Sequence, residues 1–345
     1  MLKTLSIGQA VRRQLTEEEQ WMRNPALMVS ALAFAVVITT GCGNANRAVE
    51  TANKGSNPRV TQTGPTQNKT VGGQSNSSRS GTGTASSTNT ARPAKPTRPD
   101  HIVVVVEENH GYNRIVGNKH APYINSLIRN GALFTNYHAV AHPSQPNYLA
   151  LFAGSTLGIH SDSCPHTFTQ ANLGSELTAS NLSFTGYAES LPSVGFTGCS
   201  TRTYARKHAP WVDFSNLARH VNRPFSSFSN NFTKLPTVSF VIPNVKNDMH
   251  SGSVAAGDAW LKNNLGAYAS WAKSHNSLLF ITFDEGYGLG NRVATVFYGA
   301  GVKTGKYGQS FTHYSLLRTI ESLYHLSPLG KSKQAKPMTT ALAYG

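Results

Sequence analysis

Hydrophobic positions in the second part of the chain follow two alternating patterns. From residue 101 onward, short continuous apolar runs alternate with stretches whose apolar residues recur at helical spacing. The first run, at residues 101–106, is rich in valine, as expected for a parallel strand that is covered on both faces. Strands are predicted at residues 101–106, 132–137, 183–187, 237–242, 277–283 and 293–298, and helices at 122–130, 145–153, 173–180, 258–275 and 314–324. This alternation predicts an α/β fold with a mainly parallel central sheet and helices on both faces.

Polar side chains gather where the predicted strands end, and ligands of such folds bind at the carboxyl ends of the strands. Glu108 follows the first strand, Asp284 follows the strand at 277–283, and Ser144 starts a helix. The same edge is expected to hold Asn109, Asn147, Asp248, His250, Glu285 and His313. Each group alone is more typical of a turn, a helix cap or a structural histidine. Their recurrence at one edge predicts an active site.

The residue types at this edge favour hydrolysis with a hydroxyl nucleophile. Ser144 would lie at a helix N-terminus, where free N–H groups and the helix dipole favour an oxyanion or a phosphate. Its hydroxyl is a poor nucleophile until a base or a metal removes the proton. Hard oxygen ligands for a divalent cation are expected from Glu108, Asn109, Asp284 and Glu285. Asn147, one helical turn after Ser144, would donate to a phosphoryl oxygen, and a histidine would protonate the leaving alkoxide.

The N-terminal part is predicted to be an export signal followed by a tether. Residues 26–38 form an uncharged apolar run that is short for a membrane span and typical of a signal-peptide core. Cys42 follows it after a glycine, which resembles a bacterial lipoprotein signal in which the cysteine becomes lipidated. The alternative is a cleaved signal or an uncleaved anchor with an incidental cysteine, and Met22 is an alternative start.

Residues 43–97 contain no aromatic residue and are mostly small or polar, so they cannot offset their ordering entropy by burial. The predicted organisation is an N-terminal extension with a lipoprotein-type signal at 1–42, a disordered tether at 43–97 and a catalytic domain at 98–345. The protein is expected to be exported, and either secreted or held at the cell surface by the lipid on Cys42.

Composition narrows the classes of function. The net charge of +15, from 31 Lys and Arg against 16 Asp and Glu, excludes an acidic disordered protein. The sequence carries no nucleic-acid motif, so the basic surface indicates an anionic substrate, an anionic membrane or simply a solvated face. Three cysteines exclude a disulfide-rich mini-scaffold. With Cys42 assigned to the anchor, Cys164 and Cys199 remain as a pair, which in an exported protein predicts a disulfide.

Five short segments together resemble the bacterial phosphoesterase family of acid phosphatases and phospholipases C, within the alkaline phosphatase superfamily. They are VVVEEN at 104–109, HPSQPNY at 142–148, NDMH at 247–250, FDEG at 283–286 and HYSLLRT at 313–319. Their order along the chain matches the family. The segments at 142–154, 172–177, 195–199 and 204–211 look like the mycobacterial type of secreted acid phosphatase, which acts on phosphatidylinositol 3-phosphate.

The resemblance implies an alkaline phosphatase-like fold, a phosphoserine intermediate at Ser144 and a divalent metal. It implies Glu108, Asn109, Asp284 and Glu285 as the residues on the metal side. It implies His208, with Lys207, and His250 and His313 as candidates for phosphate binding and leaving-group protonation. One metal is expected, and the alternative is that Asp248 and His250 complete a second site.

Three activities fit these residues. The first is an exported phosphomonoesterase acting on phospholipid headgroups or small phosphate esters, and the second is a phospholipase C that cleaves a diester. The third is a catalytically inactive surface lipoprotein that binds anionic ligands. Because Ser144 and the Asp284–Glu285 pair are intact, an enzyme is expected, and acid phosphatase activity is the first expectation.

Overall fold

The computed structural model describes residues 98–344 of the chain. The predicted signal, Cys42 and the predicted tether fall in residues 1–97, outside the described residues. Among the helices of residues 98–344, none combines the length and the apolar character that crossing a membrane would need.

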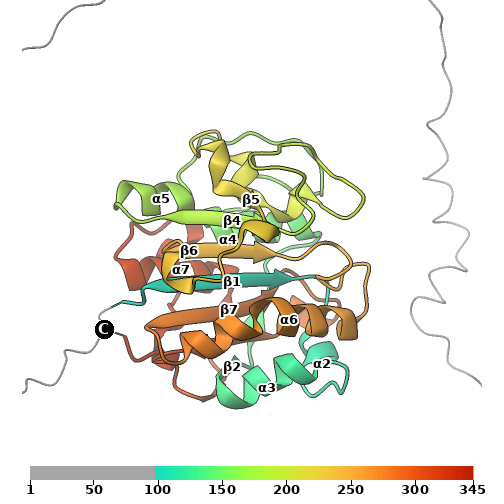
Figure 1. The fold of residues 1–345 in the computed structure, drawn as a ribbon, viewed down its shortest axis with the longest axis vertical. Helices are drawn as coiled ribbons and strands as arrows, with labels where there is room; N and C mark the ends of the chain where they lie inside the picture. The colour runs from blue at the N-terminus through green and yellow to red at the C-terminus, as the bar shows by residue number, and fades with distance from the viewer. Residues whose placement is uncertain (1–97, 345) are drawn as a thin grey trace, which may run out of the picture. The chain divides into compact units, whose positions relative to one another are not determined.

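The frame of the domain is an eight-stranded sheet with the order β5-β4-β6-β1-β7-β8-β2-β9 (Figure 1). Its strands are β1 (His101–Glu107), β2 (Ala132–Phe134), β4 (Phe184–Ala188), β5 (Asn222–Pro224), β6 (Val238–Ile242), β7 (Ser277–Phe283), β8 (Thr295–Gly299) and β9 (Gly305–Tyr307). The five strands from β5 to β7 are parallel, and β8 alone runs antiparallel to both of its neighbours. β3 (Tyr137–His138) and β10 (Phe311–Thr312) form a separate parallel pair. The carboxyl ends of β1, β6 and β7 therefore meet at one edge.

Helices cover both faces of the sheet, as the sequence predicts. They are α2 (Tyr112–Ile115), α3 (Pro122–Asn130), α4 (Ser144–Ala153), α5 (Leu173–Ala179), α6 (Val254–Ala272) and α7 (His313–Tyr324). α3 and α6 pack together on one face, and α4 and α7 pack together on the other (Figure 1). Short 3-10 turns lie at Arg206–His208, Pro210–Asp213, Arg219–Val221, Phe225–Ser227, Phe232–Lys234, Leu289–Asn291, Gly330–Gln334 and Thr339–Ala341.

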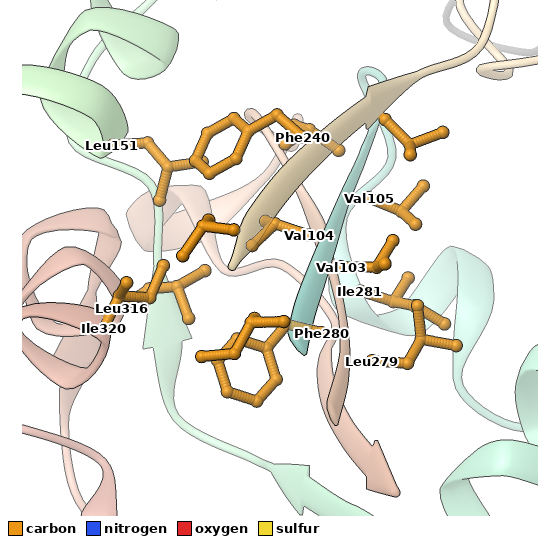
Figure 2. Close-up of a cluster of buried hydrophobic side chains, with 14 of the residues drawn as sticks. Val103, Val104, Val105, Leu151, Phe240, Leu279, Phe280, Ile281, Leu316 and Ile320 are labelled. Carbon is orange, nitrogen blue, oxygen red and sulfur yellow. The ribbon is translucent and has the colours of Figure 1, made fainter. Parts of the chain in front are cut away.

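The core is split by the sheet into two layers because successive side chains of a strand point to opposite faces. Val103 and Val105 point to the side that also holds Leu279 and Ile281 (Figure 2). Val104 points the other way, toward the layer of Phe240, Phe280, Leu151, Leu316 and Ile320 (Figure 2). All of these side chains are buried, so the valine run of β1 holds the centre of the domain together.

A disulfide joins Cys164, in the loop after α4, to Cys199, in the loop after β4, as predicted. The same loops are joined by Arg206, whose Nη2 donates to the carbonyl of His166 at 2.9 Å and whose Nη1 donates to the carbonyl of Thr197 at 2.7 Å. Its Nε donates to Asp213 Oδ1 at 2.9 Å in a buried ion pair. These contacts fix the 3-10 turn Arg206–His208, which carries two predicted site residues.

The fold class is confirmed, and the differences are in detail. The strand predicted at 132–137 is interrupted by a turn at residues 135–136, after which Tyr137 pairs with β10 rather than with the main sheet. The helix predicted at 258–275 begins at Val254, where the Ser253 side chain accepts from the N–H of Ala256, and ends at Ala272. The helix predicted from residue 145 begins at Ser144.

Candidate active site

The carboxyl edge of the sheet brings most of the predicted site residues together. Glu108 follows β1, Asp284 and Glu285 follow β7, and Asp248 lies in the loop after β6. Ser144 is the first residue of α4. The chain therefore gathers acidic groups from three neighbouring strands around the start of one helix.

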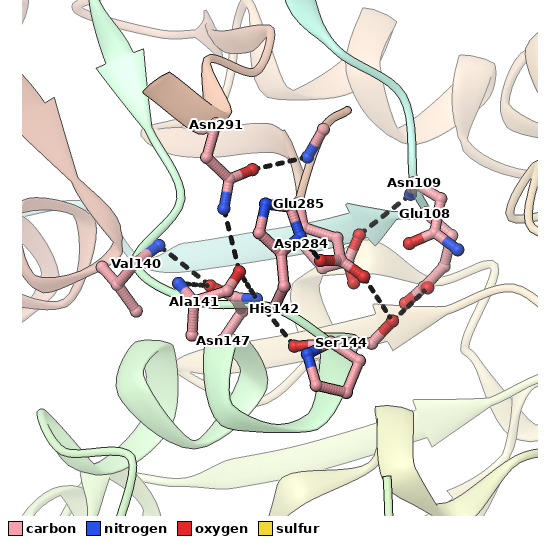
Figure 3. Close-up of polar contacts among 12 residues, drawn as sticks. Glu108, Asn109, Val140, Ala141, His142, Ser144, Asn147, Asp284, Glu285 and Asn291 are labelled. Atoms are coloured by element: carbon pink, nitrogen blue, oxygen red, sulfur yellow. Dashed lines mark hydrogen bonds and ion pairs between the residues drawn. The ribbon is translucent and has the colours of Figure 1, made fainter. Parts of the chain in front are cut away.

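Ser144 is a buried serine held between two carboxylates. Its Oγ lies 3.1 Å from Glu108 Oε2 and 3.3 Å from Glu285 Oε1 (Figure 3). A hydroxyl has a single proton, so the two carboxylates are alternative acceptors. The side chain is 1% exposed and stands in the first turn of α4, where backbone N–H groups point away from the helix. Its surroundings therefore supply a proton acceptor and a positive helix end at the same oxygen.

Several buried polar atoms around Ser144 have no hydrogen-bond partner among the described residues. They are Asn109 Oδ1 and Asp284 Oδ2, together with His208 Nε2 and Asp248 Oδ2, which lie near oppositely charged groups but without the geometry of a hydrogen bond. Burial, with the neighbouring Glu285 carboxylate, raises the pKa of Asp284 to about 7. Burial, with the nearby Asp284 carboxylate, raises the pKa of Asp248 to about 8. Burial and the same two aspartates raise the pKa of Glu108 well above its usual value. A cluster of this kind is costly when ionised unless a cation compensates it.

The donor set fits a divalent metal. His208 lies between two carboxylates, with Nε2 at 3.2 Å from Glu108 Oε1 and Nδ1 at 3.4 Å from Asp248 Oδ2. One ligand atom from each of these three buried residues lies within 4.8 Å of the others. Burial lowers the pKa of His208 well below its usual value, so its ring is neutral, the form that binds metals. The sequence predicts Glu108 on the metal side, but it places His208 with the phosphate, whereas here His208 stands with Glu108 and Asp248.

Asn109 connects the ends of β1 and β7. Its backbone N–H donates to Asp284 Oδ1 at 3.0 Å (Figure 3), and its φ of 54° places it in the left-handed region that asparagine tolerates. This turn leaves the side-chain oxygen buried beside the acid cluster. Asn109 and Asp284, both predicted on the metal side, are therefore held against each other through the backbone.

Two asparagines hold the loops that carry Ser144 and Asp284. Asn147 accepts from the N–H groups of Val140 and Ala141 at 2.9 and 3.0 Å, and it donates to the carbonyls of Ala141 and Pro143 at 2.9 and 3.1 Å (Figure 3). Its amide is thus bound to the loop that presents Ser144, while donation to a phosphoryl oxygen stays a prediction. Asn291 donates to the Ala141 carbonyl at 2.8 Å and accepts from the Gly286 N–H at 2.7 Å.

The rim of the site carries an ion pair and an aromatic stack. Glu285 Oε2 is paired with His142 Nδ1, so this carboxylate contacts both Ser144 and His142. The His142 ring stacks on Tyr287 with centroids 6.1 Å apart and planes 15° apart. The Tyr287 side chain is 72% exposed. The Glu285 side of the site is therefore the side that faces solvent.

The three predicted histidines occupy different positions. His313 is buried with Nε2 at 2.6 Å from the Asp284 carbonyl and Nδ1 at 3.0 Å from Tyr137 Oη, and burial lowers its pKa to about 4. His250 is exposed, and its ring centroid lies 6.0 Å from that of the buried His208. Both ring nitrogens of His313 are therefore occupied, while His250 faces solvent beside the acid cluster.

Two residues that contact the site, Tyr148 and Asp162, carry no predicted role. Tyr148, one turn after Ser144, donates its hydroxyl proton to Glu108 Oε1 and stacks on the His208 ring with centroids 5.1 Å apart. The i and i+4 spacing from Ser144 could have revealed it. Asp162 accepts from Lys207 Nζ at 2.7 Å, and no sequence pattern marks it because it lies in an irregular loop.

Comparison with known proteins identifies a family whose sequence model matches this chain. Residues 118–327 match the model of the Phosphoesterase family. A phosphatidylinositol-3-phosphatase of Mycobacterium tuberculosis is 53% identical over 243 residues, which cover 69% of this chain and 81% of that protein. An acid phosphatase of Aspergillus fumigatus is 30% identical, over 59% of this chain and 51% of that protein, so the chain spans about half of its length.

A solved structure shows the same fold at low sequence identity. A candidate sulfatase from Bacteroides thetaiotaomicron superposes with a TM-score of 0.51 at 12% identity, over 72% of this chain and 75% of that one. At this identity the likeness shows a shared fold alone.

Proposed function

The chain belongs to the Phosphoesterase family and is a phosphoric ester hydrolase, and we propose that Ser144 is its nucleophile, attacking phosphomonoesters in an exported acid phosphatase. The observation that carries the proposal is the buried Ser144 hydroxyl at the start of α4, within reach of the Glu108 and Glu285 carboxylates. A serine that only capped the helix would not need two carboxylates at its oxygen.

The chemistry follows from these contacts. Ser144 Oγ passes its proton to the carboxylate of Glu285 or Glu108 and forms a bond to phosphorus as the ester oxygen leaves. We assign the proton for the leaving alkoxide to His250, because its exposed ring stands beside the acid cluster whereas the ring of His313 is occupied. A water molecule then loses its proton to the same histidine and attacks phosphorus, the bond from phosphorus to Ser144 Oγ breaks, and Oγ takes back the proton held by the carboxylate as phosphate leaves.

The acid cluster would serve this chemistry by holding one divalent cation, with a ligand set that differs from the one expected from the sequence. Glu108, His208 and Asp248 would supply the ligands, with Asn109 and Asp284 offering further oxygens close by. A bound cation lowers the pKa of a nearby hydroxyl and neutralises charge on phosphoryl oxygens. Glu285, which the sequence places on the metal side, is outside this ligand set. Its Oε1 contacts Ser144 and its Oε2 is paired with His142, so we assign it to proton transfer.

The proposed substrate is a phosphoinositide, with phosphatidylinositol 3-phosphate as the first compound to test. The 53% identical Mycobacterium tuberculosis relative, named for that activity, supports it. We also propose that residues 26–42 direct export and that a lipid on Cys42 keeps the enzyme at the cell surface, on the basis of the sequence pattern alone. A surface-held enzyme would meet lipid headgroups directly.

The test compares wild type with Ser144→Ala. Phosphate release by the full chain is measured from p-nitrophenyl phosphate, bis(p-nitrophenyl) phosphate and vesicles that carry the 3- or the 4-phosphate of phosphatidylinositol, with and without a chelator. Loss of Ser144 should lower kcat by at least about 10³-fold on the monoesters while the melting temperature is kept, because only the hydroxyl is removed. Chelation should remove the activity, and a divalent metal should restore it.

Other results of the same assay would favour other functions. Serine-dependent cleavage of the diester would favour a phospholipase C-type enzyme. Absence of any serine-dependent release from folded, metal-supplied protein would leave an anion-binding surface protein. Equal rates on the 3- and 4-phosphates of phosphatidylinositol would remove the proposed preference for the 3-phosphate while keeping the monoesterase.

A further inference from the structure

Asp162 lies between the nucleophile helix and Lys207. Its Oδ1 accepts from the backbone N–H of Gln145 at 3.0 Å, and its Oδ2 accepts from Lys207 Nζ at 2.7 Å. Gln145 is the residue after Ser144, and Lys207 is the residue before His208. One carboxylate thus connects the start of α4 to the 3-10 turn that brings His208 to the site.

The segment around Asp162 is held in place from several directions. When the buried Gln145 amide is oriented so that its nitrogen meets acceptors, it donates to the carbonyls of Ser161 and Ser163 at 3.2 and 2.7 Å. Two residues after Asp162, the Cys164–Cys199 disulfide joins this loop to the one that leads into Lys207. Asp162 is therefore a fixed carboxylate rather than a loose surface group.

The Lys207 ammonium is attracted both by the Asp162 carboxylate and by the buried carboxylates of the site. The buried carboxylates are those of Glu108 and Asp284, and the partly exposed carboxylate of Asp162 lies 2.7 Å from Lys207 Nζ. Asp162 and Lys207 are both partly exposed, with 30% and 19% of their side chains accessible, so the pair stands at the mouth of the site. A lysine ammonium has three N–H donors, so two remain after the bond to Asp162.

Building on the proposed function, we propose that Asp162 is a positioning residue. Its carboxylate holds the Lys207 ammonium at the mouth of the site, where the free N–H groups of that ammonium bind the phosphate of an incoming monoester. Asp162 itself does not touch substrate. A role limited to capping α4 is the competing explanation, because the Gln145 N–H bond is also a helix-end contact.

Substitution can separate the two roles. Asp162→Asn keeps an oxygen that can accept from Gln145 N–H but removes the charge that holds Lys207, whereas Asp162→Ala removes both. On the full chain, we expect Asp162→Asn to raise KM for p-nitrophenyl phosphate about three- to tenfold, with kcat within about twofold and the melting temperature nearly unchanged. The dissociation constant of inorganic phosphate, measured by calorimetry, should rise by the same factor. Asp162→Glu should recover part of the loss.

Asp100→Asn is the matched control, because this exposed carboxylate precedes β1 and the substitution removes the same charge far from Lys207 in the sequence. It should leave KM and phosphate binding unchanged. Lys207→Gln completes a double-mutant cycle. Once Lys207 is replaced, Asp162→Asn should not weaken phosphate binding any further.

Unchanged phosphate binding in Asp162→Asn, or effects of Asp162→Asn and Lys207→Gln that multiply, would overturn the positioning role. A weakening seen only in Asp162→Ala, together with a lower melting temperature, would assign Asp162 to the helix cap. A different result would contradict the proposed function, namely the absence of Ser144-dependent turnover in the wild type. Phosphate calorimetry would still test the role of Asp162 in that case.

Discussion

Asn291 shows how a single side chain can keep two loops in register. It bonds to the carbonyl of Ala141 on the loop before Ser144 and to the N–H of Gly286 on the loop after Asp284 and Glu285 (Figure 3). These are the loops whose separation sets the distance from the Ser144 hydroxyl to the Glu285 carboxylate. Because proton transfer depends steeply on that distance, Asn291 should matter for turnover although it does not touch the serine.

We expect Asn291→Ala to lower kcat about tenfold or more and to destabilise the domain by about 1–2 kcal/mol, since two hydrogen bonds are lost and their partners are left unpaired. Activity assays and urea unfolding measure the two effects. Asn264→Ala is a suitable control, because Asn264 bonds only to the preceding turn of α6. Wild-type turnover in Asn291→Ala would show that the loops keep their spacing without this contact.

Whether the sequence can place a site residue depends on how close that residue lies to a regular helix or strand. Ser144, Glu108 and Asp284 could be placed together from sequence because each directly follows or starts a regular element. Asn291 and Asp162 could not, since Asn291 ends a short 3-10 turn and Asp162 lies in an irregular loop, and the path of both segments depends on long-range contacts. The position of His208 beside Asp248 was unpredictable for the same reason.

At the scale of elements, the 3-10 turn Arg206–His208 is positioned by its surroundings rather than by helix propensity. The disulfide, the Arg206–Asp213 ion pair and the Lys207–Asp162 pair hold it against α4. A turn of three residues has almost no stability of its own. Loss of the covalent link should therefore affect both stability and function.

Replacing both Cys164 and Cys199 by Ser should lower the free energy of unfolding by about 3–4 kcal/mol, the loop-closure value for a separation of 35 residues. KM should rise as well, because Asp162 and Lys207 lie on the two linked loops. Urea unfolding and steady-state kinetics test both effects, and reduced wild type should match the double variant. A variant with unchanged KM would mean that non-covalent contacts suffice to hold the turn.

The strands of the sheet differ in how well the sequence pattern predicts them. Strands buried on both faces, such as β1 and β7, carry continuous apolar runs and were predicted almost to the residue. The antiparallel direction of β8 was not predictable, because an apolar run has no sense of direction. The break between β2 and β3 is not predictable for a similar reason. Tyr137 is apolar, so the pattern does not show whether it continues β2 or pairs with another strand.

At the scale of the whole molecule, the acid cluster sets how stability depends on pH. Asp284 and Asp248 have pKa values raised to about 7 and about 8 by burial and by neighbouring carboxylates, whereas in an unfolded chain they would titrate near 4. Below about pH 6.5 the effect of these raised values is opposed by the buried His208 and His313, whose pKa values are lowered, because only the unfolded chain protonates them there. Between about pH 6.5 and 8 the folded, metal-free protein binds more protons than the unfolded one. Its free energy of unfolding must therefore fall as the pH rises.

We expect the melting temperature of the chelated protein to be lower at pH 8 than at pH 6.5, with the free energy of unfolding falling by about 1–2 kcal/mol per pH unit in this range. A divalent metal should remove or reverse this slope, because it binds the deprotonated carboxylates. Thermal unfolding at several pH values, with chelator and with Mn²⁺, Mg²⁺ or Zn²⁺, measures it. Asp248→Asn should flatten the slope while Asp100→Asn should not, and a chelated protein that becomes more stable toward pH 8 would contradict the expectation.

The strand order has a consequence for the life of the nascent chain. β1 is made first, but its two partners in the sheet are β6 and β7, which are synthesised near the end. Until then β1 lacks both of its partner strands, so the centre of the sheet cannot assemble for most of the synthesis. If the protein crosses the membrane in that state, as the proposed signal requires, the nucleophile meets its carboxylates only after translocation. The phosphate esters of the compartment where the enzyme is made would then never encounter its assembled form.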